Sequence, residues 1–192
     1  MKEKILRETF RLLLEKGLYG VSVSDIQGAA GISRALIYHH FANKDDLFMR
    51  ACTVYFIDRY VECDLPPSGK HPVWESFKMI AEARRRIAEE LASSAGGARV
   101  FIQNYNILFY QASQKYAGLR TALEAALKKY AEIMRAAQRA GRIRKGISPD
   151  FLARLSFYVF DGVANYADDA GGLSVNAAMY SEFKRLYSLV KA

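Results

Sequence analysis

The segment that most constrains the fold is residues 22–47, SVSDIQGAAGISRALIYHHFANKDDL, because it contains the start and stop signals of two short, closely spaced helices. Ser22 and Asp25 have the spacing of a capping box, which opens the first helix, and Gly31 ends it. Ser33 then follows as a typical N-cap for the second helix. Two short helices joined by so tight a turn predict a helix-turn-helix, a unit that places one helix in a DNA groove.

The second of these helices, over residues 34–41, has an inward and an outward face. Ile37 and Phe41 are four positions apart, so both are expected to face the core. The outward positions are Ala35, Leu36 and His39, and the flanking positions are Tyr38 and His40. A short helix with an exposed face is suited to contact base edges in a major groove.

Further positions on either side agree with this arrangement. Those that form one pattern are Ile5, Leu6, Gly17, Ser22, Asp25, Ile26, Ala30, Gly31, Ile32, Ser33, Ile37, Tyr38, Phe41, Lys44 and Leu47. In this pattern residues 5–47 resemble the DNA-binding segment of TetR-family transcriptional regulators. Thr9 and Gln27 stand where the family usually has Ala, and Leu36 stands where it usually has Thr or another small residue.

The resemblance implies an all-α fold in two parts. Residues 1–47 are expected to form a three-helix, helix-turn-helix DNA-binding domain, and residues 48–192 a C-terminal helical bundle for ligand binding and dimerisation. It also implies roles for individual side chains. Those expected to face base edges are Arg34, Ala35, Leu36 and His39, and those expected at phosphates are Ser24, Tyr38, His40 and Lys44. For Tyr38 and His40 the alternative is a solvated helix flank.

Charge alone does not identify a DNA partner. The chain has a net charge of +8, but residues 1–50 hold eight Lys or Arg against six Asp or Glu, which leaves only +2 there. The other basic clusters are Arg84, Arg85 and Arg86, and Arg135, Arg139, Arg142, Arg144 and Lys145. Such clusters usually form solvated helix faces, with DNA flanks or an acidic effector as the alternative.

Several other classes of protein find little support. The apolar runs are shorter than the roughly 18 residues of a membrane span, and no signal peptide is recognised, so a cytoplasmic location is expected. Cys52 and Cys63 lie eleven positions apart on one predicted helix, about 16 Å by helical rise, and cannot bridge. Buried, reduced thiols are favoured over a redox sensor. The three histidines offer no metal-ligand set and no catalytic motif is present, so no metal, no cofactor and no enzyme is predicted.

The rest of the chain is predicted to be helical. The expected helices cover residues 2–16, 44–64, 72–91, 98–114, 116–140, 149–168 and 175–191. The last two resemble the family's dimer interface, a four-helix bundle between subunits, although both could instead complete a monomer core. The residues expected in this interface are Phe151, Leu155, Gly162, Tyr166, Met179, Phe183 and Leu186.

Two charged residues fall on predicted inward faces, Asp58 on the helix over 44–64 and Arg84 on the helix over 72–91. An inward charge is costly unless it is paired or meets a ligand. Asp58 and Arg84 are therefore expected either to form a structural ion pair or to line an effector pocket. The aromatic residues expected around such a pocket are Tyr55, Trp74, Phe101, Tyr105, Phe109 and Tyr130.

The sequence therefore predicts a homodimeric, ligand-responsive transcriptional regulator. We expect a repressor that binds a pseudo-palindromic double-stranded DNA operator and is released by a small-molecule effector. The alternative is an all-helical small-molecule-binding protein or enzyme in which the helix-turn-helix serves only packing.

Overall fold

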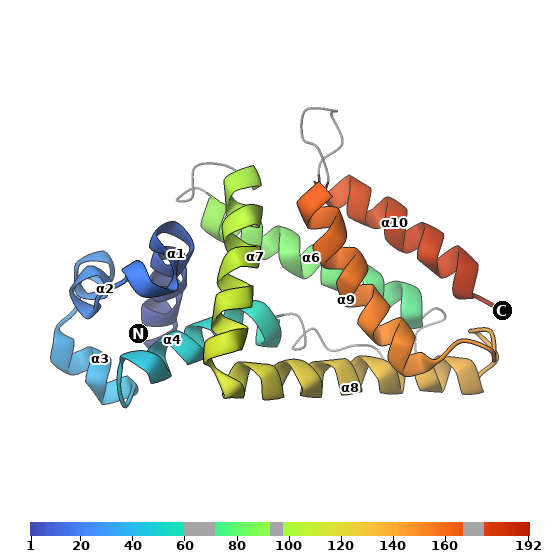
Figure 1. Cartoon of the computed structure of the whole chain (residues 1–192), viewed down its shortest axis with the longest axis horizontal. Coiled ribbons are helices and arrows are strands. Elements are labelled where there is room, and N and C mark those ends of the chain that lie inside the picture. Colours follow the sequence, from blue (N-terminus) through green and yellow to red (C-terminus); the bar gives the residue numbers. More distant parts are fainter. Residues whose placement is uncertain (60–71, 93–97, 167–174) are drawn as a thin grey trace. The chain divides into compact units, whose positions relative to one another are not determined.

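The computed structural model describes residues 1–59, 72–92, 98–166 and 175–192 of the chain. Within these ranges the regular elements are helices, apart from one β-bridge between Ile143 and Lys191. They are α1 (Lys2–Gly20), α2 (Val23–Ala30), α3 (Arg34–His40), α4 (Lys44–Thr53), the π-helix η1 (Val54–Asp58), α6 (Pro72–Ala92), α7 (Ala98–Lys115), α8 (Ala117–Arg139), α9 (Pro149–Tyr166) and α10 (Val175–Val190). The predicted all-α fold class is confirmed for the described residues, and the helix ends that lie within them are close to the predicted ones (Figure 1).

The chain forms two compact units. The first unit consists of Met1–Arg59 and Ile87–Ala122, and the second of Tyr60–Arg86 and Leu123–Ala192. The helix-turn-helix therefore shares its compact unit with α7, which follows it by more than fifty positions in the chain. The predicted boundary at residue 47 between a DNA-binding domain and a ligand-binding and dimerisation domain is a functional division, and it stays a prediction.

Helix α1 is the centre of the first unit, where α2, α4 and α7 pack around it (Figure 1). Its apolar stripe, which includes Ile5, Phe10 and Leu13, is completely buried. Gly17 interrupts the helix with φ 73° and ψ 170°, a conformation that side chains with a Cβ rarely adopt. The predicted break after residue 16 is therefore present as a kink, beyond which the chain makes one more helical turn.

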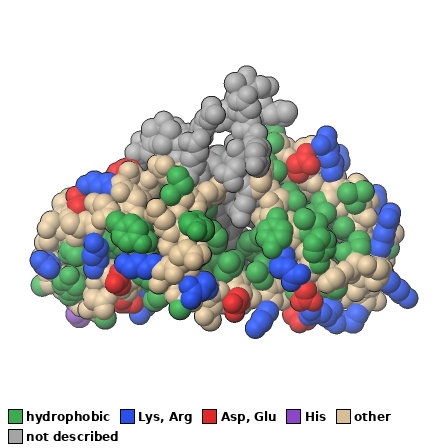
Figure 2. Space-filling model, viewed as in Figure 1, with side chains coloured by type: hydrophobic (Ala, Val, Ile, Leu, Met, Phe, Trp, Pro, Cys, Tyr) green, Lys and Arg blue, Asp and Glu red, His purple; other side chains and the backbone are tan. Residues whose placement is uncertain are grey.

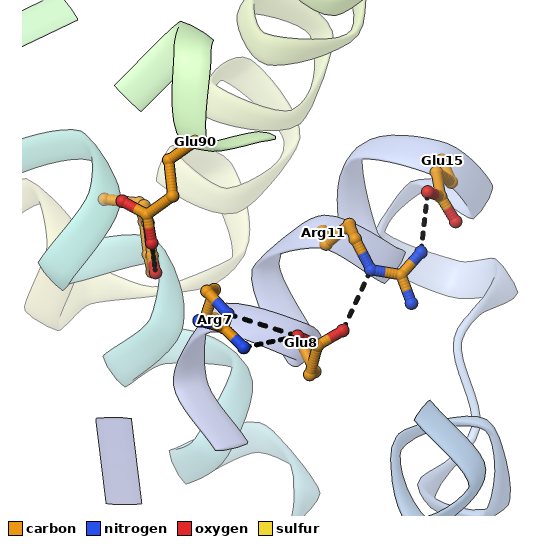
Figure 3. Close-up of polar contacts among 6 residues, drawn as sticks. Arg7, Glu8, Arg11, Glu15 and Glu90 are labelled. Atoms are coloured by element: carbon orange, nitrogen blue, oxygen red, sulfur yellow. Dashed lines mark hydrogen bonds and ion pairs between the residues drawn. The ribbon is translucent and has the colours of Figure 1, made fainter. Parts of the chain in front are cut away.

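The outer face of α1 carries a row of alternating charges (Figure 3). Arg11 donates through Nε to Glu8 at 3.0 Å and through Nη1 to Glu15 at 2.7 Å, and Arg7 pairs with Glu8 at 3.1 Å. Spacings of three and four positions bring such side chains together on a helix and stabilise it by a few tenths of a kcal/mol per pair. These pairs also neutralise the carboxylates of Glu8 and Glu15.

The helix that begins at Lys44 changes its winding at Val54, where η1 follows α4 without a break. A π turn holds an extra residue, so the buried face shifts around the helix. Tyr55, Phe56 and Ile57 are consequently all buried, whereas Val54 and Asp58 are partly exposed. The prediction that Asp58 lies on an inward face is wrong for this reason. Residues 60–64 of the predicted helix lie outside the described residues.

An aromatic cluster fills the space between α1, η1 and α7. The ring of Phe10 stacks on Tyr55 at 4.5 Å, and the ring of Phe56 meets Tyr105 at 4.7 Å and Phe109 at 5.1 Å. Stacked and edge-to-face rings at these distances are well-packed core contacts. Burial also raises the pKa of the Tyr55 phenol well above its ordinary value.

In the second unit, α10 packs against α9 and its apolar stripe faces α6. Phe183 stacks on Phe77 with ring centroids 4.7 Å apart, and Phe183 and Met179 have no exposed surface. The expectation that Met179 and Phe183 lie in a dimer interface is therefore wrong, because a side chain buried in its own chain has no surface to offer a partner. Leu186 is 9% exposed and belongs to the same core.

Helix α9 keeps an apolar face outside this core. Phe151 is 48% exposed and Tyr158 is 60% exposed, and Leu155 between them is partly exposed. A Cβ built on Gly162 would meet no described atom within 4 Å, so no part of the chain that the structure describes packs closely there. Figure 2 shows hydrophobic side chains gathered over the region where α9 runs in Figure 1. The side chain of Tyr166 lies outside the described residues.

Candidate nucleic-acid interface

The caps predicted for the helix-turn-helix are all present. The Ser22 hydroxyl accepts from the Asp25 backbone N–H at 3.1 Å, and the Asp25 carboxylate accepts from the Ser22 backbone N–H at 2.8 Å. Gly31 ends α2 in the left-handed conformation, with φ 64°. The Ser33 hydroxyl then accepts from the Leu36 N–H at 3.2 Å and starts α3. These local bonds set where the two helices begin and end.

Helix α3 is held from one side only. Ile37 and Phe41 are each 1% exposed and anchor it to the core of the first unit, as predicted. The positions predicted to face bases are solvent-accessible, with Arg34, Ala35 and His39 exposed and Leu36 partly exposed. Tyr38 is exposed and His40 partly exposed, in agreement with flanking positions.

The predicted phosphate contacts surround this helix. Ser24 is exposed in the first turn of α2, and Lys44 is partly exposed in the first turn of α4. The Arg34 guanidinium carbon lies 5.6 Å from the Tyr38 ring centroid, and the Lys44 ammonium lies 5.0 Å from the Phe48 ring centroid. Both cations rest on aromatic rings, which orients them without neutralising their charge.

The carboxylates of residues 1–50 all have basic partners. The pairs are Glu3 with Arg59, Glu8 with Arg7 and Arg11, Glu15 with Arg11, Asp25 with Lys16, Asp45 with Lys115, and Asp46 with Arg50. In the described part of the chain, no carboxylate lies within ion-pair distance of Arg34 or Lys44. The small net charge of this segment therefore understates how positive its α3 face is, because the negative charges are already paired.

One of these pairs comes from a part of the chain that sequence reasoning did not connect to the helix-turn-helix. Lys115, at the end of α7, donates to Asp45 Oδ1 at 2.7 Å, and the Tyr116 hydroxyl donates to the same oxygen at 3.1 Å. These residues are 70 and 71 positions away from Asp45. No local pattern marks such a contact, so the sequence offered no signal for it.

The residues predicted to line an effector pocket do not come together in one described site. Tyr55, Tyr105 and Phe109 belong to the aromatic cluster of the first unit. In the second unit the ring centroids of Trp74 and Tyr187 are 5.9 Å apart, and those of Tyr130 and Phe157 are 5.4 Å apart. The side chains of Arg84 and Phe101 lie outside the described residues, so the expected contact of Arg84 with Asp58 does too.

An open surface pocket of about 250 Å³ lies between α8 and α9. Its lining residues are Glu124, Leu127, Lys128, Ala131, Asp150 and Arg154, none of which was predicted to bind a ligand. Elsewhere, Cys52 is buried, and this burial raises the pKa of its thiol to about 12, which keeps the thiol protonated at neutral pH. Cys63 lies outside the described residues. Among the described helices, none is both long and apolar enough to span a membrane.

Comparison with known sequences agrees with this geometry. Residues 5–51 match the model of the bacterial regulatory proteins of the tetR family. Over 61 residues the chain is 36% identical to IcaR of Staphylococcus epidermidis, an HTH-type negative transcriptional regulator of the biofilm operon icaADBC; the match covers 30% of this chain and 33% of IcaR. The chain thus spans a third or less of the length of the curated relatives that it matches.

Comparison with solved structures extends the likeness to the whole fold. The tetR regulator TylP of Streptomyces fradiae has a TM-score of 0.75 at 14% identity, over 99% of this chain and 86% of TylP. SmeT, the repressor of the Stenotrophomonas maltophilia multidrug efflux pump SmeDEF, has a TM-score of 0.70 at 16% identity, over 100% of this chain and 91% of SmeT. At these identities the likeness concerns the fold alone. The helices beyond the DNA-binding segment follow the same course as in those regulators.

Proposed function

We propose that this chain is a TetR-family transcriptional regulator, that it represses transcription by binding a pseudo-palindromic operator as a homodimer, and that a small-molecule effector releases it. The observation that carries the DNA-binding part is the exposed outward face of α3, where no carboxylate of the described residues lies within ion-pair distance of Arg34 or of Lys44 in the first turn of α4. A partner that offers phosphates next to hydrogen-bonding base edges matches this face. Such a partner also agrees with a cytoplasmic location.

The roles of the individual side chains follow from their places on the face. Arg34 and His39 point away from the core and are proposed to contact base edges, with Ala35 and Leu36 beside thymine methyl groups. Tyr38, His40, Lys44 and Ser24 lie around them and are proposed to contact phosphates. A phosphate contact adds affinity for any sequence, whereas a base contact adds preference.

The test is selection of DNA from a pool of fragments of the source genome, followed by sequencing of the bound fraction. We expect enrichment of one inverted repeat whose half-sites are about one helical turn, or 34 Å, apart. A chain that enriches no sequence, or that binds all DNA equally even at about 0.15 M salt, contradicts a specific regulator. That result would favour the rival function, a helical small-molecule-binding protein or enzyme with a structural helix-turn-helix.

The homodimer is proposed from α9 and α10. These helices pack on each other within the chain, and α9 leaves Phe151, Leu155 and Tyr158 accessible. No described atom lies within 4 Å of a Cβ built on Gly162, which would allow a partner helix to approach the backbone closely. An inverted-repeat operator needs two reading helices related by a two-fold axis, which a symmetric dimer supplies. Light scattering at working concentration measures the oligomeric state directly.

Effector release is proposed to act through the helix that begins at Lys44. Its first turn carries the proposed phosphate contact at Lys44, and Asp58 lies fourteen positions further along the chain, within η1. A ligand that favours another position of this helix weakens DNA binding, and operator DNA must then weaken ligand binding by the same factor, about 5- to 150-fold. Thermal-shift screening identifies an effector, and equal ligand affinity with and without operator contradicts the coupling.

A further inference from the structure

The first turn of α4 combines a proposed phosphate contact with two acidic side chains. Lys44 is followed directly by Asp45 and Asp46. Acidic residues stabilise the first turn of a helix, because they interact favourably with the positive end of its dipole. The same charges repel a DNA phosphate that approaches Lys44. Tight binding there requires that both carboxylates be neutralised.

The two carboxylates are neutralised by different parts of the chain. Asp46 accepts from Arg50, one turn further along the same helix, at 2.7 Å, and from the Ala42 backbone N–H at 3.0 Å. Asp45 depends on the junction of α7 and α8, where Lys115 and Tyr116 both donate to its Oδ1. These bonds hold the pKa of the Asp45 carboxyl below its ordinary value, chiefly through Lys115, so it stays charged.

The junction is packed onto α4 as well as bonded to it (Figure 1). Tyr116 is 7% exposed, and a Cβ built on Gly118 would lie 2.8 Å from Sδ of Met49 in α4. The Lys115 ammonium lies 5.2 Å from the Tyr116 ring centroid and 5.8 Å from that of Tyr19. Lys115 is thus held over Asp45 by the two aromatic rings and by the close packing of the Gly118 backbone against Met49.

We propose that Lys115 is a positioning residue for DNA binding: it acts through Asp45, whose negative charge it masks beside the phosphate contact at Lys44. This inference rests on the proposed DNA-binding function. When Lys115 stays on Asp45, the first turn of α4 presents Lys44 to a phosphate. When the α7–α8 junction withdraws, the bare carboxylate faces the same phosphate and weakens binding. Operator affinity therefore depends on a contact that never touches DNA.

The expected size follows from Coulomb's law. An unpaired unit charge about 8 Å from a phosphate changes the affinity by about twofold in a water-like dielectric, and by about fivefold when both half-sites of a dimer are affected. The Debye length shrinks from roughly 14 Å at 0.05 M salt to about 3 Å at 1 M salt, so the effect must fade as salt rises.

The experiment measures affinity for the selected operator by fluorescence anisotropy at low and high salt. Lys115→Gln removes the masking charge, and we expect a loss of about two- to fivefold at low salt that shrinks at high salt. Asp45→Asn alone should bind at least as tightly as the unmodified chain. The double variant should bind like the unmodified chain, because the two removed charges cancel and no carboxylate is left to mask.

The chain offers a matched control in the second unit. Arg135 pairs there with Asp150 at 2.9 Å, with side-chain exposures of 34% and 55%, against 34% and 61% for Lys115 and Asp45. Arg135→Gln and Asp150→Asn change the net charge in the same way, and neither should change affinity beyond the common effect of net charge. Melting temperatures of all variants identify any loss of folding.

The outcomes separate the possible roles. A double variant that binds as weakly as Lys115→Gln alone means that Lys115 does not act through Asp45, and overturns the inference. The inference is also overturned if Lys115→Gln leaves the affinity unchanged. A loss of affinity that is the same at both salt concentrations overturns it too, because that result is expected of a merely structural role. If the unmodified chain selects no DNA, the proposed function fails and the inference with it; in the other cases the proposed function stands.

Discussion

The hydroxyl of Tyr105 donates a hydrogen bond to the backbone carbonyl oxygen of Tyr55, 3.1 Å away, in the buried centre of the first unit. Tyr105 belongs to α7 and Tyr55 to the π-helix that follows α4. The bond therefore ties the point where this helix changes its winding to an element 50 positions further along the chain. A π turn is often found at functional sites, and here it lies on the element proposed to carry the effector signal.

Replacement of Tyr105 by Phe should lower the free energy of unfolding by about 1 to 2 kcal/mol, because a buried hydrogen bond is lost while the ring is kept. For a chain of this size the melting temperature should fall by roughly 2 to 8 °C. Thermal unfolding followed by circular dichroism measures the change. Tyr110→Phe, at a position that is 66% exposed, is the control and should melt normally. Equal melting of both variants would show that the Tyr105 bond adds nothing to stability.

Base contacts and phosphate contacts should respond differently to mutation. Lys44→Ala should weaken binding to every DNA sequence and reduce the slope of log affinity against log salt by about 0.9. Arg34→Ala should instead relax the preference at one base position by about 1 to 3 kcal/mol, if its contact is bidentate. Binding titrations on the operator and its single-base variants distinguish the two. A uniform loss for Arg34→Ala would reassign Arg34 to the DNA backbone.

Charge placed on the apolar face of α9 should separate the proposed dimer. Phe151→Glu and Tyr158→Glu both act at exposed positions, so each chain should fold normally while burial of the new charge opposes association. Light scattering should report monomers, and operator affinity should fall. Tyr110→Glu, at an exposed apolar position of α7, should leave the dimer intact. A dimer that survives both α9 substitutions would place the interface elsewhere.

Asp25 should contribute to stability in a pH-dependent way. Its hydrogen bond from Lys16, followed by those from Ser22, lowers the pKa of its carboxyl well below the ordinary value of 3.8. A group whose pKa is lowered by folding stabilises the protein above its unfolded pKa, and this contribution is lost as the pH falls through the folded pKa. The stability difference between the unmodified chain and Asp25→Asn should therefore be constant near pH 7 and shrink below about pH 4. Denaturant unfolding across this range measures it, and a difference that grows in acid would contradict the assignment.

The local structure of the DNA-binding segment could be predicted from the sequence because its signals act over a few residues. Ser22, Gly31 and Ser33 define the helix ends through bonds to neighbours at most four or five positions away, and the structure has each of them in place. The period of Ile37 and Phe41 likewise identifies the buried face of α3 without knowledge of the packing partner. Capping and amphipathic periodicity depend on nearby residues alone, so a linear sequence contains them.

Tertiary structure alone decided the features that depend on distant residues. The π turn at Val54 moved Asp58 off the inward face, and the stacking of Phe77 on Phe183 took Phe183 into the core instead of an interface. An apolar stripe shows that a helix has a partner, but the same stripe serves a helix of the same chain or of a second copy equally well. The bond of Lys115 to Asp45 spans 70 positions and follows from where α7 ends in space. The sequence by itself determined the helices and the exposed face of α3, whereas only the packing of those helices decided which charges are paired around that face.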